Sequence, residues 1–214
     1  MLKADLHIHS NYSFDSANTL EQIIERCRKA GINCIAIADH GTAEGALKMQ
    51  KIAPFPVVVA EEILTPSGEI MGMFLKETIP TNIPLAEAIS RIKEQGGLVN
   101  VPHPFDTFTR VGLGGKTMEK IIGDIDIIEV LNARSPITTR SSQSFTFAEK
   151  YGKAGTAGSD AHTLMEIGNA YIEMPEFNGK DEFLTSLRQG KVNGKKASPF
   201  VHFGSLWARI KKPL

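Results

Sequence analysis

The 214-residue sequence predicts an α/β protein whose mainly parallel strands close into a β/α barrel. Short, almost wholly apolar segments alternate with amphipathic segments of helical period, a pattern typical of a parallel sheet covered by helices. A doubly wound open sheet would show the same alternation. Five of the six histidines stand at or just beyond the carboxyl ends of predicted strands. Because β/α barrels assemble their active sites at these strand ends, the histidines favour the barrel.

Eight segments are predicted strands, because each is a short apolar run bounded by polar or turn-forming residues. The stretch Thr65 to Gly68, which contains a Pro-Ser pair, is expected to turn the chain between the third and the fourth. In chain order the predicted strands are Leu2–His9, Cys34–Ala38, Val57–Ala60, Ile70–Leu75, Leu98–Val101, Ile125–Leu131, Ala154–Gly158 and Asn169–Ile172.

Five segments are predicted helices, because apolar residues recur in them with the helical period. The first begins at a capping box formed by Thr19 and Gln22 and ends at Gly31. Its apolar face consists of Leu20, Ile23, Ile24 and Cys27. The other helices are expected from about Ala43, from Pro84 to Gly96, over about Thr139–Tyr151 and over about Asp181–Gln189.

The composition indicates a globular protein without a preference for nucleic acid or membranes. Hydrophobic residues make up 42%, and 24 basic side chains balance 24 acidic ones, so no overall field attracts a polyanion. No apolar run approaches the ~18 residues of a membrane span, and the N-terminus lacks a signal-peptide pattern. We therefore expect a cytoplasmic protein with reduced Cys27 and Cys34 and no stable protein partner. One domain is predicted over residues 1–214, with residues 195–214, including His202, as a short C-terminal tail.

The first predicted strand carries a His-x-His pattern. Side chains alternate across a strand, so Asp5, His7 and His9 are expected on one face, with Leu6 and Ile8 on the other. Two imidazoles at positions i and i+2 can both reach one metal ion. Asp5, deeper on the same face, is expected to orient a ligand imidazole by accepting its N–H.

The other candidate ligands follow later strands. His40 comes after Cys34–Ala38, His103 after Leu98–Val101, and the pair Asp160 and His162 after Ala154–Gly158. Glu62 follows Val57–Ala60 and offers a carboxylate that can bridge two ions. Nitrogen and oxygen donors without thiolates suit Zn²⁺, Mn²⁺ or Fe²⁺. Because these donors are too many for one ion, two or three divalent ions per chain are predicted.

Four separated motifs occur in order along the chain. They are Asp-Leu-His-Ile-His-Ser (Asp5 to Ser10) continuing to Asp15, Ile-Ala-Asp-His-Gly-Thr (Ile37 to Thr42), Pro-His-Pro (Pro102 to Pro104) and Gly-Ser-Asp-Ala-His (Gly158 to His162). Together they resemble the polymerase and histidinol phosphatase (PHP) superfamily of metal-dependent phosphoesterases. The resemblance implies a distorted seven-stranded β/α barrel with a trinuclear metal site.

The resemblance also implies a ligand set and a reaction. It assigns His7, His9, Glu62 and Asp160 to one ion, Glu62 and His103 to a second, and Asp15, His40 and His162 to a third. The implied reaction is hydrolysis of a phosphate ester by a metal-bound hydroxide, on a small phosphorylated substrate or a short oligonucleotide. Asp39 is a candidate to protonate the leaving oxygen. Arg134 is a candidate to clamp the phosphate, with a solvated loop arginine as the alternative.

One position departs from the family pattern. Relatives place a histidine in the strand after the glutamate, but this sequence has Met71 there. A thioether is a poor ligand for hard ions, so the second ion is expected to keep only Glu62 and His103 and to bind weakly. Whether Glu69 replaces the missing imidazole is left open by the sequence.

Two other functions remain open. An amidohydrolase-like metal hydrolase also begins with His-x-His, but it usually bridges its ions with a carboxylated lysine, whereas Glu62 fits the bridging position here. A non-catalytic metal-binding module is the other alternative, and the near-complete ligand set argues against it.

Overall fold

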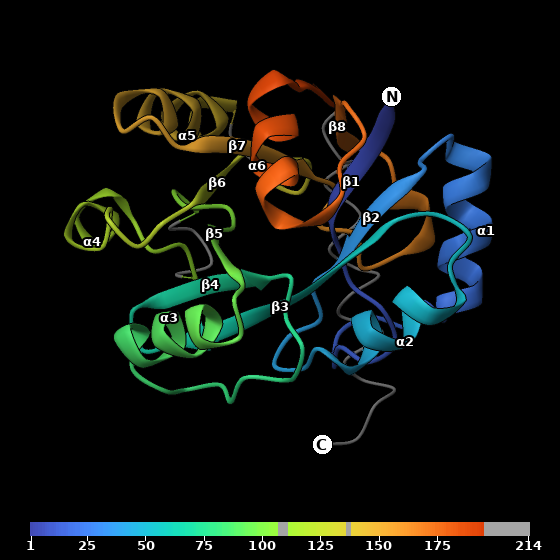
Figure 1. Ribbon diagram of the computed structural model, residues 1–214, viewed down its shortest axis with the longest axis horizontal. Coiled ribbons are helices and arrows are strands. Elements are labelled where there is room, and N and C mark those ends of the chain that lie inside the picture. The colour runs from blue at the N-terminus through green and yellow to red at the C-terminus, as the bar shows by residue number, and fades with distance from the viewer. Residues whose placement is uncertain (107–110, 136–137, 195–214) are drawn as a thin grey trace.

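The computed structural model describes residues 1–106, 111–135 and 138–194, and within these ranges nine strands form one continuous sheet (Figure 1). The predicted tail, with His202, lies outside the described residues. In space the strands follow the order β7-β6-β5-β4-β3-β2-β1-β8-β9. They are β1 (Leu2–Ile8), β2 (Cys34–Ile37), β3 (Val57–Thr65), β4 (Gly68–Met73), β5 (Leu98–Val101), β6 (Ile127–Asn132), β7 (Ala154–Gly158), β8 (Ala170–Met174) and β9 (Lys191–Gly194).

The sheet curls until β7 meets β1. Ile8 and Ala161 form an isolated parallel bridge, and the backbone N–H of His9 donates to the carbonyl of Ala161 at 2.9 Å. The predicted α/β class is therefore confirmed, and the sheet is nearly closed and barrel-like. Its strand number differs from the expected seven, because β8 and β9 add to β1 on the side away from β2.

The sheet is mixed, whereas a mainly parallel one was predicted. β4 runs antiparallel to both β3 and β5, and β8 runs antiparallel to both β1 and β9. Only Pro66 and Ser67 separate β3 from β4. A connection this short can join antiparallel strands only, since a parallel pair needs a long crossover.

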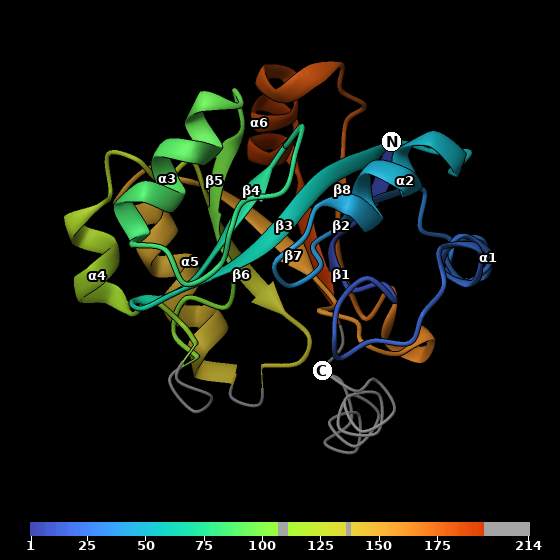
Figure 2. The same ribbon diagram turned by 90° about the horizontal axis from the view of Figure 1, so that it is seen from below.

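The helices pack against both faces of the sheet, most of them against the outer face. They are α1 (Leu20–Ala30), α2 (Glu44–Ile52), α3 (Leu85–Glu94), α4 (Gly115–Lys120), α5 (Thr138–Lys150) and α6 (Gly179–Gln189). In both ribbon views α1 and α2 lie on one side of the strands and α3, α4 and α5 on the other (Figures 1 and 2). The predicted capping box of α1 is present, and Gly31 ends this helix at φ 70°. None of the helices in the described ranges is long and apolar enough to cross a lipid bilayer.

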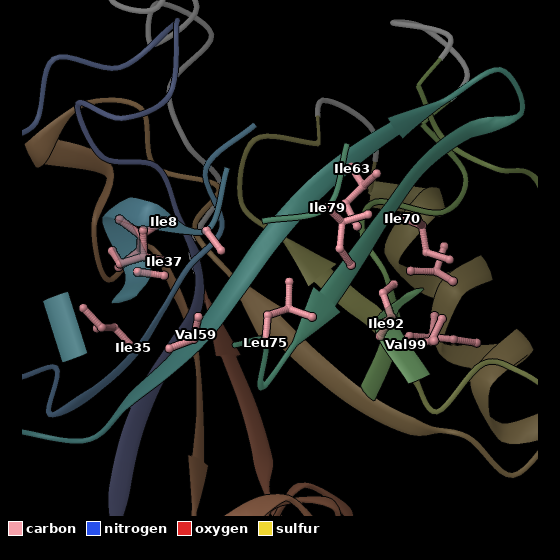
Figure 3. Close-up of a cluster of buried hydrophobic side chains, with 14 of the residues drawn as sticks. Ile8, Ile35, Ile37, Val59, Ile63, Ile70, Leu75, Ile79, Ile92 and Val99 are labelled. Atoms are coloured by element: carbon pink, nitrogen blue, oxygen red, sulfur yellow. The ribbon is translucent and has the colours of Figure 1, made fainter. Parts of the chain in front are cut away.

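Two apolar layers hold the fold together. The outer layer lies between sheet and helices and includes Ile35, Ile63, Ile70 and Ile92 (Figure 3). The inner layer collects side chains from the other face of the strands, with Phe183 of α6 packed against them. Its strand residues are Leu2, Ala4, Leu6, Cys34, Ala36, Ala38, Val58, Ala60, Met71, Met73, Leu98, Ile127, Ala154, Ile172 and Met174. Most of them stand near the beginnings of the parallel strands, so the inner face is apolar at that end.

A β-bulge in β1 changes which side chains face inward. Asp5 pairs with Ile35 of β2 but Ile8 pairs with Ile37, so β1 holds one extra residue between these pairs. Leu6 belongs to the inner layer and Ile8 to the outer one. The predicted alternation, with both on the same face, is therefore wrong in this half of the strand.

Candidate metal centre

The eight predicted ligands converge where the parallel strands end. Within the described residues, their side chains form overlapping groups whose nitrogen and oxygen atoms lie within 4.8 Å of one another. The groups are His7, His9 and Asp160; His7, Glu62 and His103; His9, Asp15, His40 and His162; and His40, Glu62 and Glu69. Each group has enough donors to hold a metal ion, and the shared members join the groups into one centre.

The first group is built on β1. His7 Nδ1 lies 3.0 Å from Glu129 Oε1. An ionised carboxylate can only accept, so Nδ1 of His7 donates to it and Nε2 is the nitrogen that could bind a metal ion. Burial would lower the pKa of His7, but the charges of Glu62, Asp160 and Glu129 outweigh it and raise this pKa well above its usual value, so a bound cation would take the place of a proton on Nε2. That nitrogen lies 3.1 Å from Nε2 of His9, and His9 Nε2 lies 3.3 Å from Asp160 Oδ1. Three potential metal-ligand atoms thus converge on one point.

Glu62 occupies the middle of the centre. Its carboxylate oxygens lie 2.8 Å from His103 Nε2, 3.3 Å from His40 Nδ1, 3.4 Å from His7 Nε2 and 3.5 Å from His9 Nε2. A carboxylate in this position can contact two ions. Glu62 lies within β3, whose pairing continues to Thr65, so it does not follow the strand as predicted.

The third group joins the loop after β1 to the ends of β2 and β7. His162 Nδ1 lies 2.9 Å from the carbonyl oxygen of Asp160, which only accepts, so Nδ1 donates and Nε2 is the nitrogen that could bind a metal ion. This Nε2 lies 3.2 Å from Asp15 Oδ2, and His40 Nε2 lies 3.5 Å from the same oxygen. Here too, potential metal-ligand atoms lie close together, and the charges of Glu62 and Asp15 outweigh burial and raise the pKa of His40 to about 9.

These clusters of imidazoles and carboxylates fit a bound cation, which would replace the protons that the carboxylates otherwise hold on the imidazoles. Burial lowers the pKa of His9 to about 3, with the charges of His162 and His40 acting in the same direction, so this imidazole stays unprotonated at neutral pH. Burial alone would raise the pKa of Asp160, but the charge of His7 and a hydrogen bond from His9 outweigh it and keep this pKa well below its usual range. A neutral imidazole beside a carboxylate is the donor set of divalent transition-metal sites.

Two of the candidate ligands have unusual backbone conformations. Asp160 has φ 53° and His103 has φ 27°, both in the left-handed region that residues other than glycine rarely adopt. The backbone N–H of His103 donates to Glu129 Oε2 at 2.7 Å, and the side-chain amide of Asn132 donates to Asp160 Oδ2 at 3.3 Å. The surrounding hydrogen bonds thus hold both residues in strained conformations, as is common at functional sites.

Glu129 is an important residue that the sequence analysis did not identify. It orients His7, accepts the N–H of His103 and accepts a hydrogen bond from Asn132 at 2.9 Å. The sequence does contain a signal for it, because Glu129 is a lone carboxylate inside the otherwise apolar run at the start of β6. Gly158 is needed beside it, because a Cβ there would lie 2.3 Å from the Cβ of His7.

Asp5 does not have the predicted role. Because of the bulge, it lies on the face opposite to His7, where it pairs with Ile35. Its two oxygens accept the backbone N–H groups of Ser159 and Gly168, each at 2.9 Å. Asp5 therefore fixes the loop that carries Asp160 and His162, and Glu129 orients the imidazole instead.

Asp39 and Arg134 lie beside the centre, and neither belongs to its ligand groups. Asp39 is fully buried and accepts the backbone N–H and the hydroxyl of Ser10, both at 2.6 Å. Arg134 Nε lies 3.3 Å from Glu166 Oε1, and the arginine charge contributes to the low pKa of Asp160. Arg134 is thus a buried partner of Glu166 near the metal ligands and not a solvated loop residue.

The comparisons with known proteins agree with the resemblance seen in the sequence. The PHP domain family matches residues 5–54, and the family described as PHP-associated matches residues 141–192. An uncharacterized protein of Methanocaldococcus jannaschii is 38% identical over 180 residues, which are 83% of this chain and 72% of that protein. The chain belongs to the PHP superfamily.

Solved structures share the fold at lower identity. A two-domain protein from Bacteroides vulgatus, which contains a predicted PHP-like metal-dependent phosphoesterase, matches with a TM-score of 0.70 and 14% identity over 97% of this chain and 69% of that chain. An amidohydrolase from Chromobacterium violaceum matches with a TM-score of 0.65 and 17% identity over 77% of this chain and 89% of that chain. At these identities the likeness concerns the fold alone.

Proposed function

We propose that this protein is a metal-dependent phosphoesterase that holds two or three divalent ions with His7, His9, Asp15, His40, Glu62, His103, Asp160 and His162. The observation that carries the proposal is the position of Glu62, whose carboxylate lies within 3.5 Å of four imidazole nitrogens. A bridging carboxylate surrounded by imidazoles is suited to hold neighbouring ions, with Zn²⁺, Mn²⁺ and Fe²⁺ as candidates.

A polynuclear site suits phosphate esters because the substrate is an anion. Clustered divalent ions neutralise phosphate charge and lower the pKa of a bound water, which lets hydrolysis proceed at neutral pH. Arg134 brings a further positive charge close to Asp160. In this proposal Arg134 binds phosphate oxygens, and Asp39 acts on the leaving group only if it separates from Ser10.

A small pocket of about 10 Å³, room for about one water molecule, lies next to the centre. Its lining residues are His103, Phe105, Asp106, Glu129, Val130, Asn132, Ser135, Ser141 and Ser144. Hydroxyl and amide groups are suitable donors to phosphate oxygens. A small phosphorylated substrate or the end of a short oligonucleotide would therefore approach the centre from outside this pocket.

Turnover of a substrate panel tests the proposal. Chelated protein is reloaded with Mn²⁺, Zn²⁺ or Fe²⁺ and assayed on phosphomonoesters, phosphodiesters and amides. We expect phosphate esters to be hydrolysed and amides to be left intact. Amide hydrolysis without phosphate release would support the amidohydrolase alternative. Full metal loading without any turnover would support a non-catalytic metal-binding module.

A further inference from the structure

The Met71 side chain packs in the inner apolar layer of the sheet. It pairs with Glu62 across β3 and β4 and shares its inward face, as expected from the family register. Its sulfur, however, accepts from the side-chain amide of Asn100 at 3.3 Å, and its side chain belongs to the inner apolar layer. The position at which relatives have a histidine is therefore occupied here by an apolar side chain that packs in the inner layer.

Glu69 points into the space next to Glu62. It lies two residues before Met71 on the same strand, so both side chains face the same side of the sheet. Its carboxylate oxygens lie 3.6 Å from His40 Nδ1 and 3.6 Å from His103 Nε2. Both separations exceed hydrogen-bond length, so the carboxylate lies among ligand atoms without bonding them directly.

The backbone around Glu69 is fixed. Its N–H donates to the carbonyl of Val111 at 2.7 Å. The preceding Gly68 has φ 124°, and a Cβ there would lie 2.9 Å from the same carbonyl oxygen. Glu69 is only 6% exposed. A carboxylate fixed in this buried position needs a positive charge close by, since burying an unpaired charge is costly.

We propose that Glu69 is a metal-binding residue that takes the place of the missing histidine and holds the second ion together with Glu62 and His103. The proposal rests on the metal centre of the proposed function. It replaces the sequence-based expectation that this ion has two protein ligands. With two carboxylates and one imidazole, the donor set is richer in oxygen than one with a second histidine, which favours Mn²⁺ over Zn²⁺ at this position.

Metal counting on matched variants tests this. Purified wild type, Glu69→Gln and Met71→Leu are stripped with chelator and dialysed against Mn²⁺ or Zn²⁺. Bound metal is measured by elemental analysis, and affinity by calorimetry. We expect Glu69→Gln to lose one bound Mn²⁺ per chain, or to weaken that site by about tenfold or more, while Met71→Leu binds like wild type. Glu69→His should keep the ion and shift this site toward Zn²⁺.

Crystals soaked with Mn²⁺ give the second readout. Anomalous difference density is expected beside Glu62 and His103 in wild type, with a Glu69 oxygen in contact with it, and absent there in Glu69→Gln. The proposal is overturned if Glu69→Gln keeps the wild-type metal content and affinity, which would leave Glu69 as an ion-pair partner of the two histidines. Thermal melting in chelator checks that Glu69→Gln folds. If it does not fold, Glu69→Asp, which keeps the charge but shortens the side chain, takes its place in the metal measurements.

Metal counting separates this proposal from the proposed function. If Glu69 controls the metal content but no phosphate ester is turned over, the assignment of Glu69 stands and the phosphoesterase proposal fails. If phosphate esters are hydrolysed but Glu69→Gln retains every ion, the phosphoesterase proposal stands and the assignment of Glu69 fails.

Discussion

The two ends of the inner face of the sheet are built from the same strands and have opposite chemistry. Along β1, inward-facing Ala4 and Leu6 are followed by His7, and along β6, Ile127 is followed by Glu129. In antiparallel β4 the order is reversed, with Glu69 first and the apolar residues after it. Whether an inward-facing residue is apolar or polar therefore depends on which end of the barrel it lies at. The parallel strands reach the polar end with their last residues, and antiparallel β4 reaches it with its first.

The two ends of the inner face contribute differently to stability and to metal binding. At the apolar end, buried side chains stabilise the fold through the hydrophobic effect. At the ligand end, buried carboxylates and imidazoles cost desolvation energy and are suited to cation binding. Changes at the ligand end should therefore act mainly on metal and turnover, and changes at the apolar end mainly on stability.

The largest effect is expected at the ligand end. Asp160→Ala removes a carboxylate that faces His9 across the first group. We expect phosphoesterase turnover to fall by about a hundredfold or more, with a folded protein and a reduced metal content. Turnover and elemental analysis measure this, with Asp181→Ala in α6 as the control. If Asp160→Ala keeps wild-type turnover and full metal content, Asp160 is not a metal ligand.

At the apolar end, Leu6→Ala is expected to act on stability. Leu6 is 1% exposed in the inner layer, one residue before His7. The cavity should reduce the free energy of unfolding by about 2–5 kcal/mol, measured by urea denaturation. Metal content per folded chain should stay at the wild-type value. A loss of metal without a loss of stability would show that the two ends are not separable.

Glu129→Gln tests a residue that lies between the two ends and orients the ligand His7. The amide is nearly the same size but is a weaker acceptor for His7 Nδ1, and its NH₂ group faces the N–H of His103. Metal affinity should fall by about 10- to 100-fold, as measured by calorimetry. The matched change Glu173→Gln, on an exposed side chain of β8, should leave affinity unchanged. Equal affinity in both variants would contradict the role of Glu129.

The smallest effect is expected at Glu61, which points away from the ligands. Burial raises the pKa of its carboxyl from 4.5 to about 8, and the hydrogen bond from Ile79 opposes this shift. Between these values the unfolded chain releases the proton and the folded chain keeps it, so this group makes stability fall as pH rises.

Glu61→Gln should remove that contribution. Near pH 8 we expect the variant to be more stable than wild type by about 1–3 kcal/mol, and near pH 4.5 the difference should vanish. Denaturation of both proteins across this pH range, in chelator throughout, measures the difference. A stability difference that does not change with pH would show that Glu61 ionises normally in the folded protein.

The sequence by itself determined the α/β class, most of the strands and the candidate ligands. Strands β5 and β7 have the predicted bounds, and the ligands from His7 to His162 lie in one centre. The class and the strands could be predicted because apolar periodicity is a local property, whereas the metal-binding role of the clustered side chains stays a prediction. Strand β9 and helix α4 were missed, since neither short segment has a clear apolar period of its own.

Only the tertiary structure decided which side chains meet. The bulge that turns Asp5 away from His7 depends on the pairing of β1 with β2, and the role of Glu129 depends on β6 lying within reach of β1. Glu69 enters the centre because β4 runs antiparallel, which places its first residues beside the ends of the parallel strands. Contacts of this kind join residues far apart in the chain, and strand register and direction, which set them, are not encoded in any single segment.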